Sequence, residues 1–219
     1  MSIDKPSKSL VIYDLDGTLV DSIEIVRFIL NEFRQQSGLL PLKRIDFFPW
    51  ISLGGEDLIK NALELHKQDD VLHFLNLFRS RYYELPTPRE TIFDGVVNCL
   101  EYLRAHDYRL AICTNKPKRL AEKVLNETGL KFFFEFVNAG GDLPTKKPSK
   151  ENAQACLDYF GLKAQTAVFI GDSSVDQQLA KAVDVPFIFY RHGYDDGVNK
   201  NSIEYELKHH ADLIQFLSR

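Results

Sequence analysis

The sequence predicts an α/β fold: a doubly wound, Rossmann-like core built on a parallel sheet, with an α-helical segment inserted into it. Two observations lead to this fold class. Short runs that are apolar on both faces alternate with helical patterns, as in a parallel sheet covered by helices. One long stretch, residues 21–91, breaks that alternation and contains only helical patterns.

Five short apolar runs are the expected strands of the core. They lie at residues 10–13, 109–113, 134–137, 167–170 and 186–190. Helical patterns come between them, at residues 98–108, 118–130, 150–162 and 175–185. Two of these patterns reach Gly129 and Gly161, and glycine suits the left-handed conformation that ends many helices. Strand and helix therefore alternate through the second half of the chain.

Residues 21–91 are predicted to form an α-helical cap domain, inserted into a core domain made of residues 1–20 and 92–219. Three helical patterns in this segment begin at Ile23, Gly55 and Val71. The first stops near Gly38, and Asp21 is expected to be its N-cap.

The composition narrows the class of protein. A net charge of -4 argues against nucleic acid as a partner, but it leaves room for a small phosphorylated metabolite. No apolar run approaches a membrane span, and the first residues, MSIDKPSKS, lack the apolar part of a secretory signal. Cys99, Cys113 and Cys156 are far apart and are expected to be reduced packing residues. We expect a cytoplasmic monomer or homodimer without a membrane partner.

Polar side chains follow three of the predicted strands at the point where each strand ends. Asp14 and Asp16 follow the first, Thr114 and Asn115 the second, and Asp172 the fourth. Ligands of open α/β sheets bind beyond the carboxyl ends of the strands. If these strands are neighbours, the polar residues converge on one site.

The convergent residues suit a divalent cation and a phosphate. Clustered aspartates repel one another, and Mg²⁺ relieves that repulsion with the oxygen ligands it prefers. Thr114, Asn115 and the nearby Lys147 offer a hydroxyl, an amide and a positive charge. Asn115 is also expected to cap the next helix, with Pro117 in its first turn. A carboxylate nucleophile and a second acid would serve phosphoryl transfer, and Asp14 and Asp16 fit those roles.

Four motifs in order give the sequence its resemblance to the haloacid dehalogenase superfamily of phosphohydrolases. They are DLDGTLVDS at 14–22, CTNKP at 113–117, KKP at 146–148 and GDSSVD at 171–176. Within the superfamily the sequence is most similar to the phosphoglycolate phosphatase group, to judge from CTNKP and from WISLGGEDLIKNAL at 50–63. Asp94 departs from that group, which usually has proline at this position.

The resemblance implies roles for individual residues. Asp14 would be the nucleophile and a Mg²⁺ ligand, and Asp16 the general acid and base, with its backbone carbonyl on the metal. Asp172 would be the third protein ligand, and Asp176 would orient the metal site without binding the ion. The residues expected to hold the phosphoryl group are Thr114, Asn115 and Lys147. The inserted segment would then close over the site as a mobile cap.

The similarity to the phosphoglycolate phosphatase group implies 2-phosphoglycolate as the substrate, and this ester carries a carboxylate on its leaving group. Gly54 and Gly55 precede a predicted helix in the inserted segment, and a helix start offers N–H groups to an anion. These two glycines are therefore candidate substrate-binding residues. The alternative is that they form only a loop between helices.

Other functions remain open on the same scaffold. The protein could act on a nucleotide or sugar phosphate, or it could be a sugar-phosphate mutase. A dehalogenase would need neither the metal nor Asp16. A regulatory protein on a phosphatase scaffold would be expected to lack one of the carboxylates.

Two further segments have ordinary interpretations. KPKR at 116–119 is expected to be a solvated helix start, and Lys146 a solvated loop residue. KFFFEFV at 131–137 is expected to be core strand.

Overall fold

The computed structural model describes residues 9–218. The prediction that the first residues carry no secretory signal concerns residues 1–8 and lies outside the described range. None of the described helices is both long and apolar enough to cross a membrane. Cys99, Cys113 and Cys156 are buried and free, as predicted.

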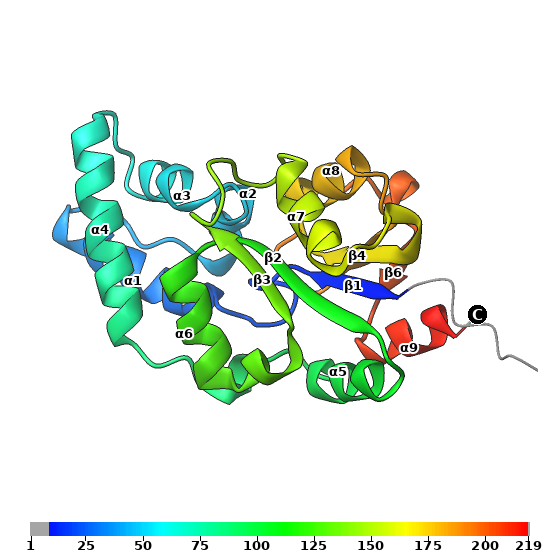
Figure 1. The fold of residues 1–219 in the computed structure, drawn as a ribbon. Coiled ribbons are helices and arrows are strands. Elements are labelled where there is room, and N and C mark those ends of the chain that lie inside the picture. The colour runs from blue at the N-terminus through cyan, green and yellow to red at the C-terminus, as the bar shows by residue number, and fades with distance from the viewer. Residues whose placement is uncertain (1–8, 219) are drawn as a thin grey trace, which may run out of the picture.

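A parallel sheet of six strands forms the centre of the molecule, in the order β3-β2-β1-β4-β5-β6 (Figure 1). The strands are β1 (Leu10–Tyr13), β2 (Arg109–Pro117), β3 (Phe136–Gly140), β4 (Ala167–Gly171), β5 (Phe187–Tyr190) and β6 (Tyr205–Leu207). Every strand pair is parallel. The predicted parallel α/β core is therefore confirmed.

Helices cover both faces of the sheet, which explains why the strands are apolar on both sides. One face carries α5 (Val96–Ala105), α6 (Lys118–Thr128) and α9 (Ala211–Leu217), and the other carries α7 (Glu151–Phe160) and α8 (Ser174–Ala182). Alternate residues of β1 enter different cores: Val11 and Tyr13 belong to one, Leu10 and Ile12 to the other. As predicted, Gly129 and Gly161 end α6 and α7 in the left-handed conformation.

The chain from residue 21 to residue 91, between β1 and α5, is helical and gathers at one end of the sheet (Figure 1). Its α-helices are α1 (Ile23–Gln36), α2 (Phe48–Ile51), α3 (Gly55–Ala62) and α4 (Gln68–Glu84). The apolar stripe of α1 is buried, including Val26, Leu30 and Phe33. Helix α4 packs against α1 and α3 and also contacts α6 of the core. We refer to residues 21–91 as the inserted segment.

Short 3₁₀ helices connect several elements. They are η1 (Arg44–Phe47), η2 (Arg89–Thr91), η3 (Leu130–Phe133), η4 (Ala164–Thr166) and η5 (Lys200–Ser202). The prediction of a core strand over KFFFEFV is wrong in its first half, because η3 occupies that stretch and β3 begins only at Phe136. Phe132 is 77% exposed and contacts the guanidinium of Arg104 instead of the core.

The predicted N-cap of the first helix is also wrong. Ser22, not Asp21, occupies the cap position of α1, and its side chain accepts no capping hydrogen bond. Asp21 instead forms an ion pair with Arg44 at 3.0 Å and accepts a hydrogen bond from the hydroxyl of Tyr194. Asp21 therefore connects the start of the inserted helices to η1 and to the loop that carries Tyr194.

Candidate active site

The order of the strands brings together the polar residues at the carboxyl ends of neighbouring strands. β1 lies between β2 and β4, and Tyr13 is in register with Ile112 on one side and Ile170 on the other. Asp14 and Asp172 therefore follow β1 and β4 directly, and Thr114 lies in the last part of β2, at the edge where α/β sheets bind ligands.

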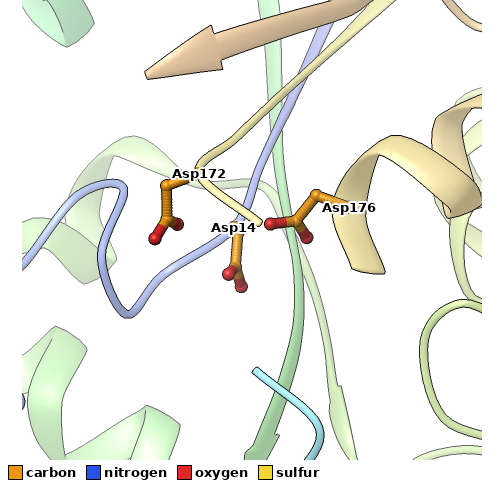
Figure 2. Close-up of side chains that lie close together, drawn as sticks. All are labelled: Asp14, Asp172 and Asp176. Atoms are coloured by element: carbon orange, nitrogen blue, oxygen red, sulfur yellow. The ribbon is translucent and has the colours of Figure 1, made fainter. Parts of the chain in front are cut away.

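Three buried carboxylates meet at this edge (Figure 2). One oxygen from each of Asp14, Asp172 and Asp176 lies within 4.8 Å of the others. We call these residues the carboxylate cluster. Asp176 enters it from the first turn of α8, where it also exchanges capping hydrogen bonds with Ser173. The sequence analysis expected Asp176 to orient the metal site without binding the ion, whereas the structure places its carboxylate among the other two.

Asp172 is held from two sides. Its Oδ1 accepts a hydrogen bond of 2.6 Å from Thr18 Oγ1, and its Oδ2 accepts one of 2.7 Å from the backbone N–H of Tyr194. Gly17 permits this close approach, because a Cβ on it would lie 2.2 Å from Asp172 Oδ2, and its φ of +84° favours glycine in any case.

The cluster carries more negative charge than its surroundings offset. Burial raises the pKa of Asp14 to about 7, against the opposing charge of Lys147. Burial, followed by the charges of Asp176 and Asp14, raises the pKa of Asp172 well above its usual range. These shifts follow from desolvation and like-charge repulsion.

The cluster fits a hard divalent cation. Its donors are all carboxylate oxygens, which Mg²⁺ prefers over nitrogen or sulfur. Lys147, whose Nζ lies 2.8 Å from Asp14 Oδ1, is one cation beside three buried carboxylates. A cation there would supply the positive charge that the raised pKa values show to be missing.

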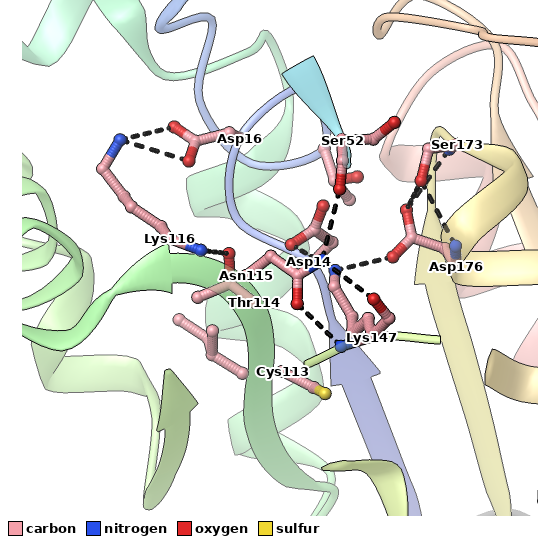
Figure 3. A network of polar contacts seen from close by, with 12 residues as sticks. Asp14, Asp16, Ser52, Cys113, Thr114, Asn115, Lys116, Lys147, Ser173 and Asp176 are labelled. Carbon is pink, nitrogen blue, oxygen red and sulfur yellow. Dashed lines mark hydrogen bonds and ion pairs between the residues drawn. The ribbon is translucent and has the colours of Figure 1, made fainter. Parts of the chain in front are cut away.

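Lys147 is the cation that the fold itself places beside the cluster (Figure 3). Its side chain is 3% exposed, and its Nζ lies 2.8 Å from Asp14 Oδ1 and 2.7 Å from Asp176 Oδ1. Burial acts to lower the pKa of Lys147, but the charges of Asp14 and Asp176 outweigh it and raise that pKa. Lys146 is exposed, as expected of the two lysines.

Asn115 holds the segment that carries Lys147. Its Oδ1 accepts from the backbone N–H of Lys147 at 2.7 Å, and its Nδ2 donates to the carbonyls of Lys147 and Ser52. The prediction that Asn115 caps the next helix is wrong, because β2 continues to Pro117 and α6 begins at Lys118. Thr114 is 5% exposed, and its hydroxyl accepts from the backbone N–H of Lys116.

Asp16 does not join the carboxylate cluster. Its two oxygens lie 3.0 and 3.1 Å from Lys116 Nζ, and Oδ1 also accepts from Ser22 Oγ at 2.5 Å. Asp14 and Asp16 would share a face only in an extended strand, but β1 ends at Tyr13. The two acids therefore have separate partners, which Figure 3 shows on either side of Thr114 and Asn115.

Lys116 is the residue that the sequence analysis misjudged most. It was expected to be solvated, but its side chain is 7% exposed. Its Nζ donates to the hydroxyl of Tyr82 on α4 at 3.0 Å and lies 4.1 Å from the centre of that ring. The signal available in the sequence was its place in CTNKP, directly after two predicted site residues.

A cavity of about 90 Å³ lies between the inserted segment and the strand ends. Its lining includes every predicted site residue except Asp176: Asp14, Asp16, Gly54, Gly55, Thr114, Asn115, Lys147 and Asp172. The remaining wall is partly apolar, with Val26, Ile51, Leu58, Phe78 and Leu120. Residues far apart in the sequence thus enclose one small space.

Gly54 and Gly55 lie at the start of α3. Gly54 has a φ of +110°, a conformation that other residues adopt only with strain. A Cβ on Gly55 would come within 2.8 Å of Leu75 Cδ1 in α4. Substitution at either glycine would thus disturb the backbone or the packing of α3, whatever the glycine does for a ligand.

Known proteins resemble this chain in sequence. The family model for haloacid dehalogenase-like hydrolases matches residues 11–190. A phosphoglycolate phosphatase of Nitrosococcus oceani is 30% identical over 87% of both chains, and one of Chromobacterium violaceum is 34% identical over 85% of this chain and 86% of its own.

Solved structures share the fold. A predicted phosphoglycolate phosphatase from Haemophilus somnus superposes with a TM-score of 0.87 at 24% identity, covering 96% of this chain and 98% of its own. A predicted phosphatase from Clostridium acetobutylicum has a TM-score of 0.80 at 18% identity, covering 97% and 99%. With its family model matched over most of the chain and relatives at least 30% identical, this protein belongs to the haloacid dehalogenase-like hydrolases.

Proposed function

We propose that this protein is a Mg²⁺-dependent phosphatase that hydrolyses 2-phosphoglycolate through an aspartyl-phosphate on Asp14. One observation carries the proposal. Asp14 is a buried carboxylate beside the ammonium group of Lys147, and it lines a cavity together with Thr114, Asn115 and Lys147. The phosphatase names of its relatives, at 30 to 34% identity, support the same reaction.

The first half-reaction transfers the phosphoryl group to the protein. Asp14 attacks the phosphorus atom, and the bond from phosphorus to the leaving oxygen breaks. Lys147 balances negative charge on the phosphoryl oxygens, since its Nζ lies 2.8 Å from the attacking carboxylate. Thr114 supplies a hydroxyl, and Asn115 fixes the backbone of Lys147 and adds its amide when the contact to Ser52 opens.

The second half-reaction returns the carboxylate. Asp16 gives a proton to the leaving oxygen in the first step and takes one from water in the second. That water attacks phosphorus, inorganic phosphate leaves, and Asp14 is free again. Asp16 lines the same cavity, and Ser22 at 2.5 Å and Lys116 at 3.0 Å fix the direction of its carboxylate.

Asp14 and Asp172, with the backbone carbonyl of Asp16, would hold the Mg²⁺ ion. When bound, the ion offsets the charge of the carboxylates and of the phosphoryl oxygens. Asp176 belongs to the carboxylate cluster but is already engaged with Lys147 and Ser173, so it acts by holding Lys147 in place.

The inserted segment, residues 21–91, acts as a cap domain over the core formed by residues 1–20 and 92–219. Its backbone reaches the site at Ser52, whose carbonyl accepts from Asn115. Gly54 and Gly55 line the cavity and contribute to substrate binding through their backbone. A cavity of about 90 Å³ suits a leaving group of a few atoms better than a nucleoside.

A phosphate-release assay with a panel of esters tests the proposal. The panel contains 2-phosphoglycolate, nucleoside monophosphates, sugar phosphates and a generic aryl phosphate, each with Mg²⁺ and with excess chelator. We expect the highest kcat/KM for 2-phosphoglycolate and no turnover with chelator. Turnover without metal, or a strong preference for a nucleotide, would contradict the proposal.

A further inference from the structure

We infer that Lys116 and Tyr82 form a binding subsite for a second anionic group of the substrate, separate from the phosphoryl side at Lys147. The inference rests on the proposed function and deepens it. It restricts the substrate class to phosphomonoesters whose leaving group carries a carboxylate or another anion close to the scissile bond.

The cavity contains two cations, not one. Within the described chain, Lys116 and Lys147 are the cationic residues that line it. Lys147 faces Asp14 and Asp176, whereas Lys116 faces Asp16 and the inserted segment. Both side chains are more than nine-tenths buried. Burying an ammonium group is costly, and one cation with a metal would already serve a phosphoryl group. Lys116 offsets the charge of Asp16, but it also lines the cavity, so a ligand anion can approach its ammonium group as well.

The chemistry around Lys116 suits a carboxylate. Its ammonium has three donors, now directed to the two oxygens of Asp16 and to the Tyr82 hydroxyl. Because the Tyr82 oxygen accepts from Lys116, its own hydrogen is available to donate. A ligand carboxylate could thus share the Lys116 ammonium with Asp16 and accept from Tyr82 as well.

The nearby wall makes the subsite selective. Leu58, Phe78 and Leu120 give the cavity an apolar wall. Charge-assisted hydrogen bonds are stronger in such surroundings than in water, so a bound anion would gain more here than on an open surface.

The start of α3 is a weaker candidate for the same anion. Its first turn carries Glu56 and Asp57, whose charges oppose a ligand anion at that end of the helix. The amine of Lys146, which could offset them, is directed to the Leu53 carbonyl and to Asp57. Lys116 and Tyr82 are therefore the residues that would bind the anion of the leaving group and select for it.

The test compares two esters, 2-phosphoglycolate and ethyl phosphate, which has a methyl group in place of the carboxylate. We expect the wild type to prefer 2-phosphoglycolate. Lys116→Met should lower kcat/KM for that ester by about 10- to 100-fold more than for ethyl phosphate, because a hydrogen bond to a charged group is lost. The change should fall mainly on KM.

Two more variants keep the test decisive if Lys116→Met does not fold. Tyr82→Phe keeps the ring and removes only the hydroxyl, so it should reduce the preference several-fold. Lys116→Arg keeps the charge and should retain part of the preference. Lys118→Met is the matched control, because Lys118 is exposed, pairs with Asp142 and does not line the cavity. It should leave both esters unaffected.

The outcomes separate this inference from the proposed function. If Lys116→Met and Tyr82→Phe each lower kcat/KM equally for both esters, the subsite is overturned. The role of Lys116 is then only to position Asp16. A wild type that hydrolyses both esters equally would overturn it too, with the phosphatase intact. A wild type that hydrolyses neither ester with Mg²⁺ would overturn the proposed function itself.

Discussion

The Nζ of Lys147 lies 2.8 Å from Oδ1 of Asp14, and both groups are buried. The lysine therefore offsets the negative charge of Asp14 away from bulk water. A buried carboxylate with a nearby positive charge is suited to nucleophilic attack or to metal binding.

Lys147→Met is expected to destabilise the metal-free protein more than the metal-loaded protein. The substitution leaves three buried carboxylates without their internal cation, and breaking a buried ion pair typically costs about 3–5 kcal/mol. Denaturant unfolding with chelator should show that loss, and added Mg²⁺ should recover part of it. Lys118→Met, an exposed lysine, should change the free energy of unfolding by less than about 1 kcal/mol. An equally small effect of both variants would contradict the role given to Lys147.

The metal-free protein is expected to lose stability as the pH rises from about 4 to about 7. The pKa of Asp14 is raised from 3.8 to about 7, so the folded state retains a proton that the unfolded chain releases. The penalty for ionising Asp14 in the folded state is absent below the unfolded pKa and complete above the folded one. Urea unfolding across this range should show a slope that is smaller in Asp14→Asn.

His210 also contributes to the pH dependence of stability in this range. Burial lowers the pKa of His210 to about 4, so this residue makes stability fall as the pH drops from about 6.5 to about 4. Its slope is opposite in sign, but wild type and Asp14→Asn share it, so their difference reports Asp14 together with Asp172, whose raised pKa depends in part on the charge of Asp14. Identical slopes in the two proteins would show that Asp14 does not titrate in this range.

Much of the fold could be predicted because it follows from local patterns. The strand at residues 10–13 has no polar face, and Gly129 and Gly161 end their helices as glycine usually does. The last strand, β6, and α9 were not predicted, because Tyr205–Leu207 is too short to show a pattern. Phe132 misled the strand prediction, since its apolar side chain lies on the surface.

The grouping of the candidate site residues could be predicted from the sequence, but the contacts that each of them makes could not. The order of strand ends indicated Asp14, Thr114 and Asp172, which the parallel sheet brings to one edge. The burial of Lys116 was not predictable, because it depends on Tyr82 arriving from the inserted segment. Such contacts between distant segments leave no local pattern in the sequence.

Asp172→Ala is expected to raise the Mg²⁺ concentration needed for half-maximal activity more than it raises the substrate KM. The change removes a carboxylate that Thr18 and Tyr194 hold in position, and it leaves Lys147 and Thr114 unaltered. Mg²⁺ titrations at saturating substrate provide the measurement. A shift in KM alone would place Asp172 with the substrate and not with the metal.

Replacing Mg²⁺ by Ca²⁺ is expected to lower activity strongly. Ca²⁺ accepts more ligands at longer distances, so it could bind both oxygens of Asp14 and prevent in-line attack. Competition of Ca²⁺ against Mg²⁺ in the phosphate-release assay checks this. Equal activity with the two ions would argue against direct contact between the metal and Asp14.

Ser52→Ala is expected to raise KM by about 3- to 10-fold, the range for a lost hydrogen bond. Ser52 Oγ donates to Asp196 at 2.6 Å, and Asp196 in turn accepts from the first N–H of α8. The contact ties the inserted segment to the core beside the cavity. Ser218→Ala serves as the control, because it removes a hydroxyl that donates to the Ile214 carbonyl and does not line the cavity. An unchanged KM in Ser52→Ala would show that this contact does not stabilise the closed arrangement.

The central claim is that Asp14 accepts the phosphoryl group, and trapping the intermediate tests it most directly. Asp16→Asn lacks the base for the second step, so rapid acid quenching with an aryl phosphate and Mg²⁺ should capture the aspartyl-phosphate. Peptide mass spectrometry is expected to find a phosphoryl group on the peptide that contains Asp14, and none there when Asp14→Asn is added. A phosphoryl group on another residue, or normal turnover by a folded Asp14→Asn protein, would contradict the account.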